Sequence, residues 1–339
     1  MKNTKSIILC TPHTHGISKA IYTALTKEGY IVYDFIIQDA TFKYKNIFQR
    51  LQNLYRKLAH KDFAYKNQLI KKARVIEIEE RLESISPADY ALFIRPDLLP
   101  KEFVLKIKNK TKKTICYQWD GLNRFPEIFD YIQYFDKFFN FDPKHINLEK
   151  GILPITNFFI TDENDYKVTK NSIYFLATYD DYRFNQLQRL KKTLQQLDIP
   201  ENLFFLPRNE DDCKILINNK YPLIEKIDYA QNLLLVQKAS ILIDLVKPIH
   251  NGLSFRIFEA LYYDIKLITD NKTVKDYDFY NPNNIFIWEE NNEDQILSFL
   301  ELEYVPVKEN IKSKYSFQNW IKYILDDGEY SAIELPSIE

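Results

Sequence analysis

The sequence predicts an α/β protein with two Rossmann-like domains. Its 339 residues exceed what a single hydrophobic core usually serves, so two domains of about 150 residues each are expected. A short apolar run, a loop, a segment of helical period and a second apolar run occupy residues 6–37, and the same order returns at residues 241–269. This order is typical of a doubly wound parallel sheet, which binds ligands at the carboxyl ends of its strands.

The first half of the chain alternates strand and helix patterns. Residues 6–10 predict a strand, and residues 17–28 predict a helix because their apolar side chains recur at helical spacing until Gly29. The other predicted elements of this half are strands at 31–37, 90–94, 113–119 and 138–141 and a helix at 103–108. An irregular stretch at residues 151–170 predicts the linker between the domains.

Residues 42–84 are charged and helical in period, and they predict a pair of amphipathic helices. The apolar stripe of the first contains Ile47, Leu51, Leu54 and Leu58. Lysine and arginine are frequent at residues 43–74, with aromatic residues between them, and such helices can rest on anionic lipid. Peripheral contact with the inner membrane through residues 43–74 is therefore one interpretation. We favour the simpler one, a solvated basic face above a buried apolar stripe.

The second half restarts the alternation after the linker. Its predicted strands are 172–178, 203–206, 241–246, 266–269 and 284–288, and its predicted helices are 185–197, one from residue 253, 296–302 and 315–325. Residues 224–237 lead into the strand at 241–246. Pro248 and Gly252 make the loop that precedes the helix from residue 253 poor in helix formers. The acidic tail 326–339 is expected to be loose.

Composition excludes several classes of protein. The net charge is −1, from 46 basic and 47 acidic residues, and no fold motif supports a nucleic-acid partner. Cys10, Cys116 and Cys213 are widely spaced and odd in number, which indicates reduced thiols in a cytoplasmic protein. No apolar stretch reaches the length of a signal peptide or a membrane span. We expect a cytoplasmic location, with peripheral contact to the cytoplasmic face of the inner membrane as the alternative.

The stretch 252–285 resembles a known family. Residues 252–261 read Gly-Leu-Ser-Phe-Arg-Ile-Phe-Glu-Ala-Leu, residues 266–271 read Lys-Leu-Ile-Thr-Asp-Asn, and residues 277–285 read Tyr-Asp-Phe-Tyr-Asn-Pro-Asn-Asn-Ile. These segments are similar to the donor half of bacterial GT-B glycosyltransferases assigned to lipopolysaccharide or capsule biosynthesis. The resemblance implies two Rossmann-like domains facing a central cleft: residues 1–160 on the acceptor side and residues 171–310 for the nucleotide-sugar donor. Residues 311–339 would form a helix packing back toward the first domain, followed by the acidic tail.

The loop before residue 255 has the chemistry of a diphosphate site. Backbone N–H groups at a helix start, a hydroxyl and cations suit a pyrophosphate, whose charge grows as it leaves. The candidate donor-binding residues of this region are Lys247, His250, Gly252, Ser254 and Arg256. Each residue also has a simpler structural interpretation. Ser254 would make a hydrogen bond at the start of the helix, and Arg256 would form an exposed ion pair.

The resemblance adds two further donor-binding residues. Glu259 stands where related enzymes carry the glutamate that holds the donor ribose, and Arg183 stands where a basic residue often touches the diphosphate. An exposed ion pair is the alternative for Glu259, and a pair with Asp180 or Asp181 is the alternative for Arg183. Many retaining relatives have a second glutamate where this sequence has Asn251, so retention and inversion both remain open.

The candidate catalytic residues lie in the first half. His13 and His15 occupy the loop after the first predicted strand, and histidine is suited to move a proton near neutral pH. Asp120 follows another predicted strand and is the third candidate for the base. A helix cap or loop hydrogen bond is the alternative for the histidines, and an Asp-Gly turn is the alternative for Asp120.

These observations predict a glycosyltransferase that moves a sugar from a nucleotide diphosphate sugar to a hydroxyl of a bacterial surface glycan or a lipid-linked glycan. The resemblance implies no metal and no cofactor besides the donor itself, although Asp180 and Asp181 are adjacent carboxylates. The alternative is a catalytically silent partner that binds a sugar or nucleotide, motivated by Asn251. A non-hydrolysing epimerase of GT-B architecture is a third, less favoured hypothesis.

Overall fold

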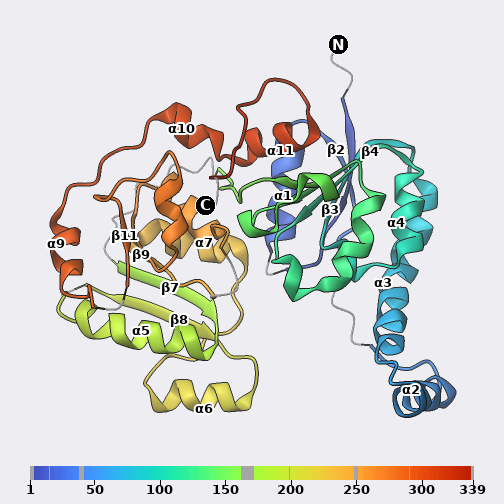
Figure 1. Cartoon of the computed structure of the whole chain (residues 1–339), viewed down its shortest axis with the longest axis horizontal. Helices are drawn as coiled ribbons and strands as arrows, with labels where there is room; N and C mark the ends of the chain where they lie inside the picture. Colours follow the sequence, from blue (N-terminus) through green and yellow to red (C-terminus); the bar gives the residue numbers. More distant parts are fainter. Residues whose placement is uncertain are drawn as a thin grey trace. The chain divides into compact units, whose positions relative to one another are not determined.

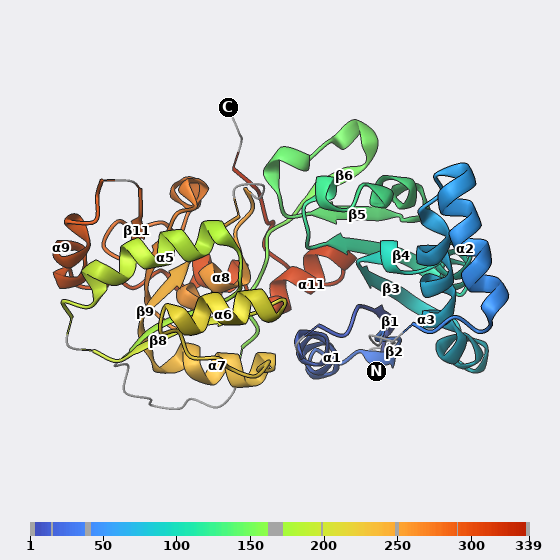
Figure 2. The ribbon, with the colours of Figure 1, turned by 90° about the horizontal axis from the view of Figure 1, so that it is seen from below.

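The computed structural model describes residues 4–14, 16–37, 42–161, 172–197, 199–247, 251–289 and 291–336. The chain divides into two compact units, each with its own sheet (Figures 1 and 2). The first unit holds most of the chain up to Asn140 together with Asn147–Leu153. The second runs from Pro154 onward and also includes Phe141–Ile146 and residues 16–20.

The first unit is built on a six-stranded sheet in the order β2-β1-β3-β4-β5-β6. The pairings from β2 through β5 are parallel, so the carboxyl ends of these strands share one edge. The strands are β1 (Ser6–Cys10), β2 (Ile31–Asp34), β3 (Ala88–Ile94), β4 (Thr111–Gln118), β5 (Lys137–Asn140) and β6 (Ile152–Pro154). Their centres are apolar and buried, as expected for a parallel sheet covered on both faces.

Helices cover both faces of this sheet. Figure 1 shows α1 (Ile17–Lys27) on one face and α3 (Ala64–Ser84) and α4 (Lys101–Lys108) on the other. α2 (Ile47–His60) lies at the end of α3, away from the sheet, and the 3₁₀ helix η3 (Pro126–Tyr134) follows β4. Short 3₁₀ turns are η1 (Pro96–Leu98), η2 (Leu122–Arg124), η4 (Pro143–His145) and η5 (Leu148–Lys150).

The expectation that the apolar stripe of residues 47–58 is buried is wrong. Ile47, Leu51, Leu54 and Leu58 are each more than half exposed. The sequence period correctly identifies an amphipathic helix, but only packing decides which side of the helix faces the protein.

The second unit has a five-stranded sheet in the order β11-β10-β9-β7-β8, with all neighbouring strands parallel. The strands are β7 (Ser172–Thr178), β8 (Glu201–Leu206), β9 (Ala239–Asp244), β10 (Lys266–Thr269) and β11 (Ile285–Ile287). The helices are α5 (Asp181–Leu194), α6 (Glu210–Asn218), α7 (Tyr229–Lys238), α8 (Phe255–Tyr262), α9 (Gln295–Glu301), α10 (Glu309–Lys314) and α11 (Phe317–Leu325), and η6 (Lys272–Asp276) is a 3₁₀ helix.

The strands of this sheet direct alternate side chains to two separate cores. Ile173 and Phe175 pack with Leu187 and Leu190 of α5, whereas Tyr174 between them packs with α7 and α8 on the opposite face. The β9–α8–β10 crossover therefore fixes the start of α8 at the carboxyl edge of the sheet.

The last helix packs on a segment that precedes the second sheet. Trp320 Nε1 donates to the Thr156 carbonyl at 2.9 Å, and its ring lies 4.5 Å from that of Phe158. Both partners belong to the second unit. Packing of this helix against the first domain stays a prediction. No helix in the described ranges is both long and apolar enough to cross a bilayer.

Several predicted bounds shift for identifiable reasons. α5 begins at Asp181, four residues before the predicted start, because the Asp180 side chain caps it. α7 has no predicted counterpart, and it begins at Tyr229, where Asp228 and Gln231 form a capping box. The helix predicted at 315–325 begins at Phe317 with a cap from Ser316, and α10 precedes it. The sequence patterns did not predict α6, α7 or η3.

Candidate functional site

The candidate donor site gathers at the carboxyl edge of the second sheet. Asp244 ends β9 and is 5% exposed, and Ser254 immediately precedes α8. The Ser254 hydroxyl donates to Asp244 Oδ1 at 2.8 Å and makes no capping hydrogen bond to α8. The simple capping role for Ser254 is therefore wrong.

Several buried polar atoms at this edge have no hydrogen-bond partner among the described residues. They include Oδ2 of Asp244, which is an acceptor, and Nε of Arg256, which is a donor. Buried groups of this kind are uncommon and call for a partner that the chain itself does not supply, such as water or a ligand.

Arg256 and Glu259 lie one turn apart on α8. Arg256 Nη1 donates to the Leu176 carbonyl at 2.7 Å, and the guanidinium carbon is 5.8 Å from the centre of the Tyr174 ring. Glu259 is 3% exposed, and burial raises the pKa of its carboxyl group while the nearby Arg256 charge lowers it. The alternative of exposed surface ion pairs is therefore wrong for both residues.

Arg183 brings α5 to the same edge. Its backbone N–H donates to Asp180 Oδ1 at 3.0 Å. Its side-chain Nε donates at 2.7 Å to the carbonyl of Leu245, the residue directly after β9. The side chain also pairs with Asp180 at 3.5 Å, and Lys247 Nζ lies 3.8 Å from the same carboxylate. Burial lowers the pKa of Arg183, and the Asp180 charge opposes this shift. The two cations are thus held beside one carboxylate at the strand ends.

Asp270 is a further member of this edge that sequence reasoning missed. It follows β10, accepts the Val246 N–H at 2.8 Å and accepts the Tyr182 hydroxyl at 3.0 Å. Burial, together with the Asp244 charge, raises the pKa of Asp270 to about 6. A hollow of about 330 Å³ opens beside it. Its lining residues are Tyr182, Gln186, Asp270, Lys272, Trp288 and Glu289.

Part of the predicted diphosphate loop is occupied by protein. The Asn251 N–H donates to Asp142 Oδ2 at 3.1 Å, and Asp142 is fully buried. A Cβ atom added to Gly252 would lie 2.4 Å from a ring carbon of Phe141, so this glycine permits close approach of another segment of the unit. Because the Asn251 N–H already donates to the Asp142 carboxylate, it is not available to a diphosphate. A bound diphosphate would have to accept hydrogen bonds from the backbone N–H groups nearer to α8.

Asp120 lies at the carboxyl edge of the first sheet, but both of its oxygens are paired. Oδ2 accepts Arg95 Nη1 at 2.7 Å and Oδ1 accepts Arg124 Nη1 at 2.9 Å. Arg95 also forms two hydrogen bonds with Asp97 and lies 3.6 Å from the centre of the Phe125 ring. These contacts favour a role of Asp120 in fixing the loops after β3 and β4, and its role as a base stays a prediction.

The histidine candidates are only partly described. The His13 backbone N–H donates to the Ile37 carbonyl at 2.8 Å, and its side chain is exposed, so it is available to a substrate. His15 and His250 lie outside the described residues. All three cysteines are free thiols, and two of them are buried.

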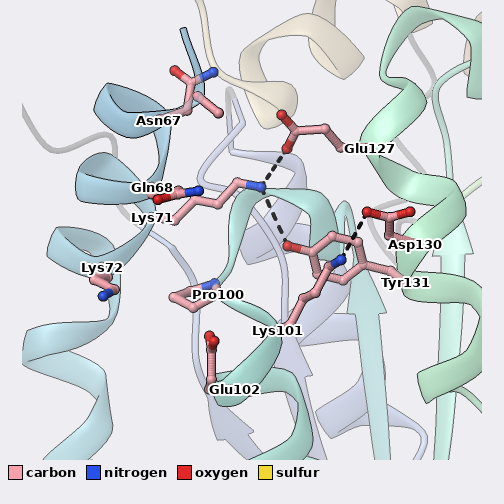
Figure 3. A pocket seen from close by; sticks show the side chains of 11 residues that line it. Asn67, Gln68, Lys71, Lys72, Pro100, Lys101, Glu102, Glu127, Asp130 and Tyr131 are labelled. Atoms are coloured by element: carbon pink, nitrogen blue, oxygen red, sulfur yellow. Dashed lines mark hydrogen bonds and ion pairs between the residues drawn. The ribbon is translucent and has the colours of Figure 1, made fainter. Parts of the chain in front are cut away.

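A second hollow, of about 460 Å³, lies in the first unit beside α3 and η3 (Figure 3). Lys71 contacts Glu127 at 2.6 Å and the Tyr131 hydroxyl at 3.4 Å, and Lys101 contacts Asp130 at 2.9 Å. Its lysines and carboxylates largely neutralise one another, and none of the predicted site residues lines it. Among the residues that the structure describes, no group of three or more histidine, cysteine or acidic side chains could hold a metal ion.

The missed residues share one sequence signal. Asp244 and Asp270 are acidic residues at the carboxyl ends of short apolar runs, which is where a parallel sheet collects its polar site. Asp142 follows the run 138–141 in the same way. The same signal identified Asp120 as a candidate, and it applies equally to Asp142, Asp244 and Asp270.

Comparisons with known proteins establish the fold. No protein-family model matches the chain, and no curated protein matches it. UDP-GlcNAc 2-epimerase from Methanocaldococcus jannaschii is similar in structure, with a TM-score of 0.51 and 12% identity, over 95% of this chain and 98% of that chain. AviGT4, a glycosyltransferase involved in avilamycin A biosynthesis, has a TM-score of 0.47 and 9% identity over 96% and 100% of the two chains.

A third structure, the glycosyltransferase SnogD from Streptomyces nogalater, has a TM-score of 0.44 and 12% identity, covering 93% of this chain and 95% of that chain. Identities this low bear on fold and not on activity. With its two parallel-sheet α/β units, the chain therefore has the architecture of two Rossmann-like domains that characterises the GT-B fold.

Proposed function

We propose that this protein is a glycosyltransferase that moves a sugar from a nucleotide diphosphate sugar to a hydroxyl of a bacterial surface glycan, such as lipopolysaccharide, capsule or a lipid-linked precursor. The observation that carries the proposal is the convergence of Arg183, Lys247, Arg256 and Glu259 at the carboxyl edge of one parallel sheet. Open α/β sheets bind nucleotides at this edge.

The geometry supports a role for the cations in stabilising the leaving group. Arg183 and Arg256 are each anchored by one hydrogen bond to a backbone carbonyl, and a guanidinium has further N–H groups that a diphosphate can accept. Their charge attracts the diphosphate more strongly as its bond to the sugar breaks. We propose that these side chains and the amides at the start of α8 perform this role without a metal ion.

Glu259 is proposed to hold the donor ribose. Its carboxylate is buried beside Arg256, so hydrogen bonds from two ribose hydroxyls would replace the water that burial removes. Hydrogen bonds to a charged acceptor are stronger than those between neutral groups.

The transfer step conserves atoms and charge. The acceptor hydroxyl oxygen attacks the anomeric carbon, the bond from that carbon to the diphosphate oxygen breaks, and its electron pair stays on the diphosphate. The hydroxyl proton passes to a base, for which His13, His15 and Asp120 are proposed. Of these, the exposed His13 is preferred over Asp120, whose oxygens already accept two guanidinium groups.

Calorimetric titration with UDP, GDP, ADP, CDP and TDP tests the donor site. We expect one of them to bind the wild type, and Arg183→Ala and Glu259→Ala to weaken that binding. A protein that binds none of the five, or whose binding is indifferent to both substitutions, contradicts the proposal. The matching sugar nucleotides then identify the donor by release of the nucleoside diphosphate in the presence of glycan acceptors.

Two other functions predict different products. A catalytically silent partner, suggested by Asn251 with its N–H on Asp142, predicts nucleotide binding with no turnover on any donor and acceptor. An epimerase, suggested by the similarity in fold to UDP-GlcNAc 2-epimerase, predicts interconversion of the donor without an acceptor. Nuclear magnetic resonance of the sugar after incubation with and without acceptor separates the three.

A further inference from the structure

α2 presents an apolar face to solvent. Six of its 14 residues are large apolar side chains that are between 52% and 76% exposed. Their positions recur at intervals of one, three and four residues, so they share one side of the helix. They are Ile47, Phe48, Leu51, Leu54, Tyr55 and Leu58. Soluble surfaces seldom expose so continuous an apolar patch without a partner.

The opposite, polar side of α2 faces the protein. Asn53 is the buried residue of the helix, and its Nδ2 donates to the Tyr44 hydroxyl at 3.0 Å. Gln52 accepts the Tyr65 hydroxyl of α3 at 2.7 Å. These hydrogen bonds fix the rotation of α2 with its apolar face outward, which is the reverse of a helix that covers a core.

The neighbouring helix α3, which leads on from α2, is held in place by contacts with the first unit. Lys71 of α3 points toward Glu127 and Tyr131 of η3 (Figure 3). Its Nζ lies 2.6 Å from Glu127 Oε2 and 3.4 Å from the Tyr131 hydroxyl. Val75 and Leu82 of the same helix are buried against the first unit. α2 lies at the end of this helix, away from the sheet (Figure 1), so its apolar face is presented from a supported position.

The charge around α2 is strongly one-sided. Residues 42–74 contain ten lysine and arginine residues and a single acidic residue, Asp62. Arg50 is exposed on α2, and Lys43, Lys45 and Lys61 are exposed in the segments directly before and after the helix. An apolar stripe bordered by cations matches a surface with negative charge outside and hydrocarbon beneath, which describes an anionic lipid bilayer.

We propose that α2 is an interfacial helix that seats this protein on an anionic lipid surface. Its apolar face enters the acyl boundary and the flanking cations lie at the lipid phosphates. The proposal stands on the first unit alone and does not depend on the donor site, so liposome binding and nucleotide binding can fail separately.

Co-sedimentation of the full chain with vesicles tests the proposal. The protein should bind vesicles that contain phosphatidylglycerol roughly tenfold or more tightly than vesicles of phosphatidylcholine alone, and high salt should reduce the difference. The Phe48→Glu/Leu58→Glu double variant should lose at least about tenfold in binding, because two anchoring side chains become charged.

Matched variants separate the apolar and charge contributions. Lys43→Gln/Lys45→Gln/Lys61→Gln should weaken binding to anionic vesicles by about fivefold for each cation removed. Leu148→Glu is the control, because Leu148 belongs to the first unit and is 68% exposed, as Ile47 is, but lies away from α2 in sequence. The exposed triple K150Q/K220Q/K226Q repeats the charge change elsewhere, and neither control should alter binding.

Three results would overturn the proposal. The first is no sedimentation with either vesicle, and the second is equal binding by wild type and the Phe48→Glu/Leu58→Glu variant with unchanged melting temperatures. The third is a concentration-dependent dimer in analytical ultracentrifugation that this variant abolishes while vesicle binding is absent. That outcome would assign the apolar face to a second copy of the chain.

Discussion

Glu259→Gln is the sharpest test of the donor site because it should act oppositely on binding and stability. Glutamine keeps the shape of the side chain and removes its charge. Glu259 is 3% exposed and burial raises its pKa, so the charged carboxylate is costly in the empty protein. The substitution relieves that cost, and we expect the melting temperature to stay constant or rise.

The same change should weaken donor binding. A hydrogen bond to a charged partner contributes about 1.5–3 kcal/mol, so its loss corresponds to about a ten- to hundredfold increase in Kd. The appropriate assay is isothermal titration calorimetry with the nucleoside diphosphate that binds the wild type, beside thermal unfolding of the empty variant. A residue that only supports the fold would produce the reverse pattern, with a lower melting temperature and an affinity that scarcely changes.

Glu201→Gln is the matched control. Glu201 begins β8 at the amino edge of the same sheet, and its Oε1 is buried without a hydrogen-bond partner among the described residues. It receives the same substitution far from the strand ends that form the candidate site. If Glu259→Gln leaves Kd within about twofold of the wild type, or if Glu201→Gln weakens binding equally, the ribose role assigned to Glu259 is wrong.

Three further substitutions test other parts of the structure. Gly252→Ala should lower the free energy of unfolding by about 1–3 kcal/mol in urea titrations, because the new Cβ would meet Phe141 at 2.4 Å; unchanged stability would contradict the close packing. Arg95→Ala should cost about 3–5 kcal/mol, since it leaves Asp97 and Asp120 without their shared cation, and a loss below 1 kcal/mol (roughly the worth of a surface pair) would refute a structural role. Asp270 has a folded pKa of about 6, so it should reduce stability by about 2–3 kcal/mol as the pH rises from about 4 to 6. Asp270→Asn should remove that decline, and parallel pH profiles of the melting temperature for variant and wild type would contradict the shift.

The main features of the fold and part of the site could be predicted because they depend on local patterns. Apolar runs and helix periods locate β9, α8 and β10. The shared edge of parallel strands then places Arg183, Ser254 and Arg256 at the carboxyl ends of one sheet. These inferences need only the order of elements and the handedness of the crossovers.

The remainder depends on contacts that local sequence does not encode. Asp142 reaches the Asn251 amide across 109 positions of the chain, and Asp270 joins Val246 and Tyr182 only when three loops meet. The sequence period of α2 likewise gives the stripe but not its direction. That direction follows from the Asn53 contact with Tyr44 and the Gln52 contact with Tyr65.

The way α2 is attached makes it separable from the rest of the protein. The connection from β2 to β3 requires one covering helix, and α3 supplies it. The described hydrogen bonds of α2 side chains remain within residues 44–65. Removal of α2 would therefore leave the sheet intact. In evolution this helix can be gained, lost or altered in sequence without changes in the rest of the first unit.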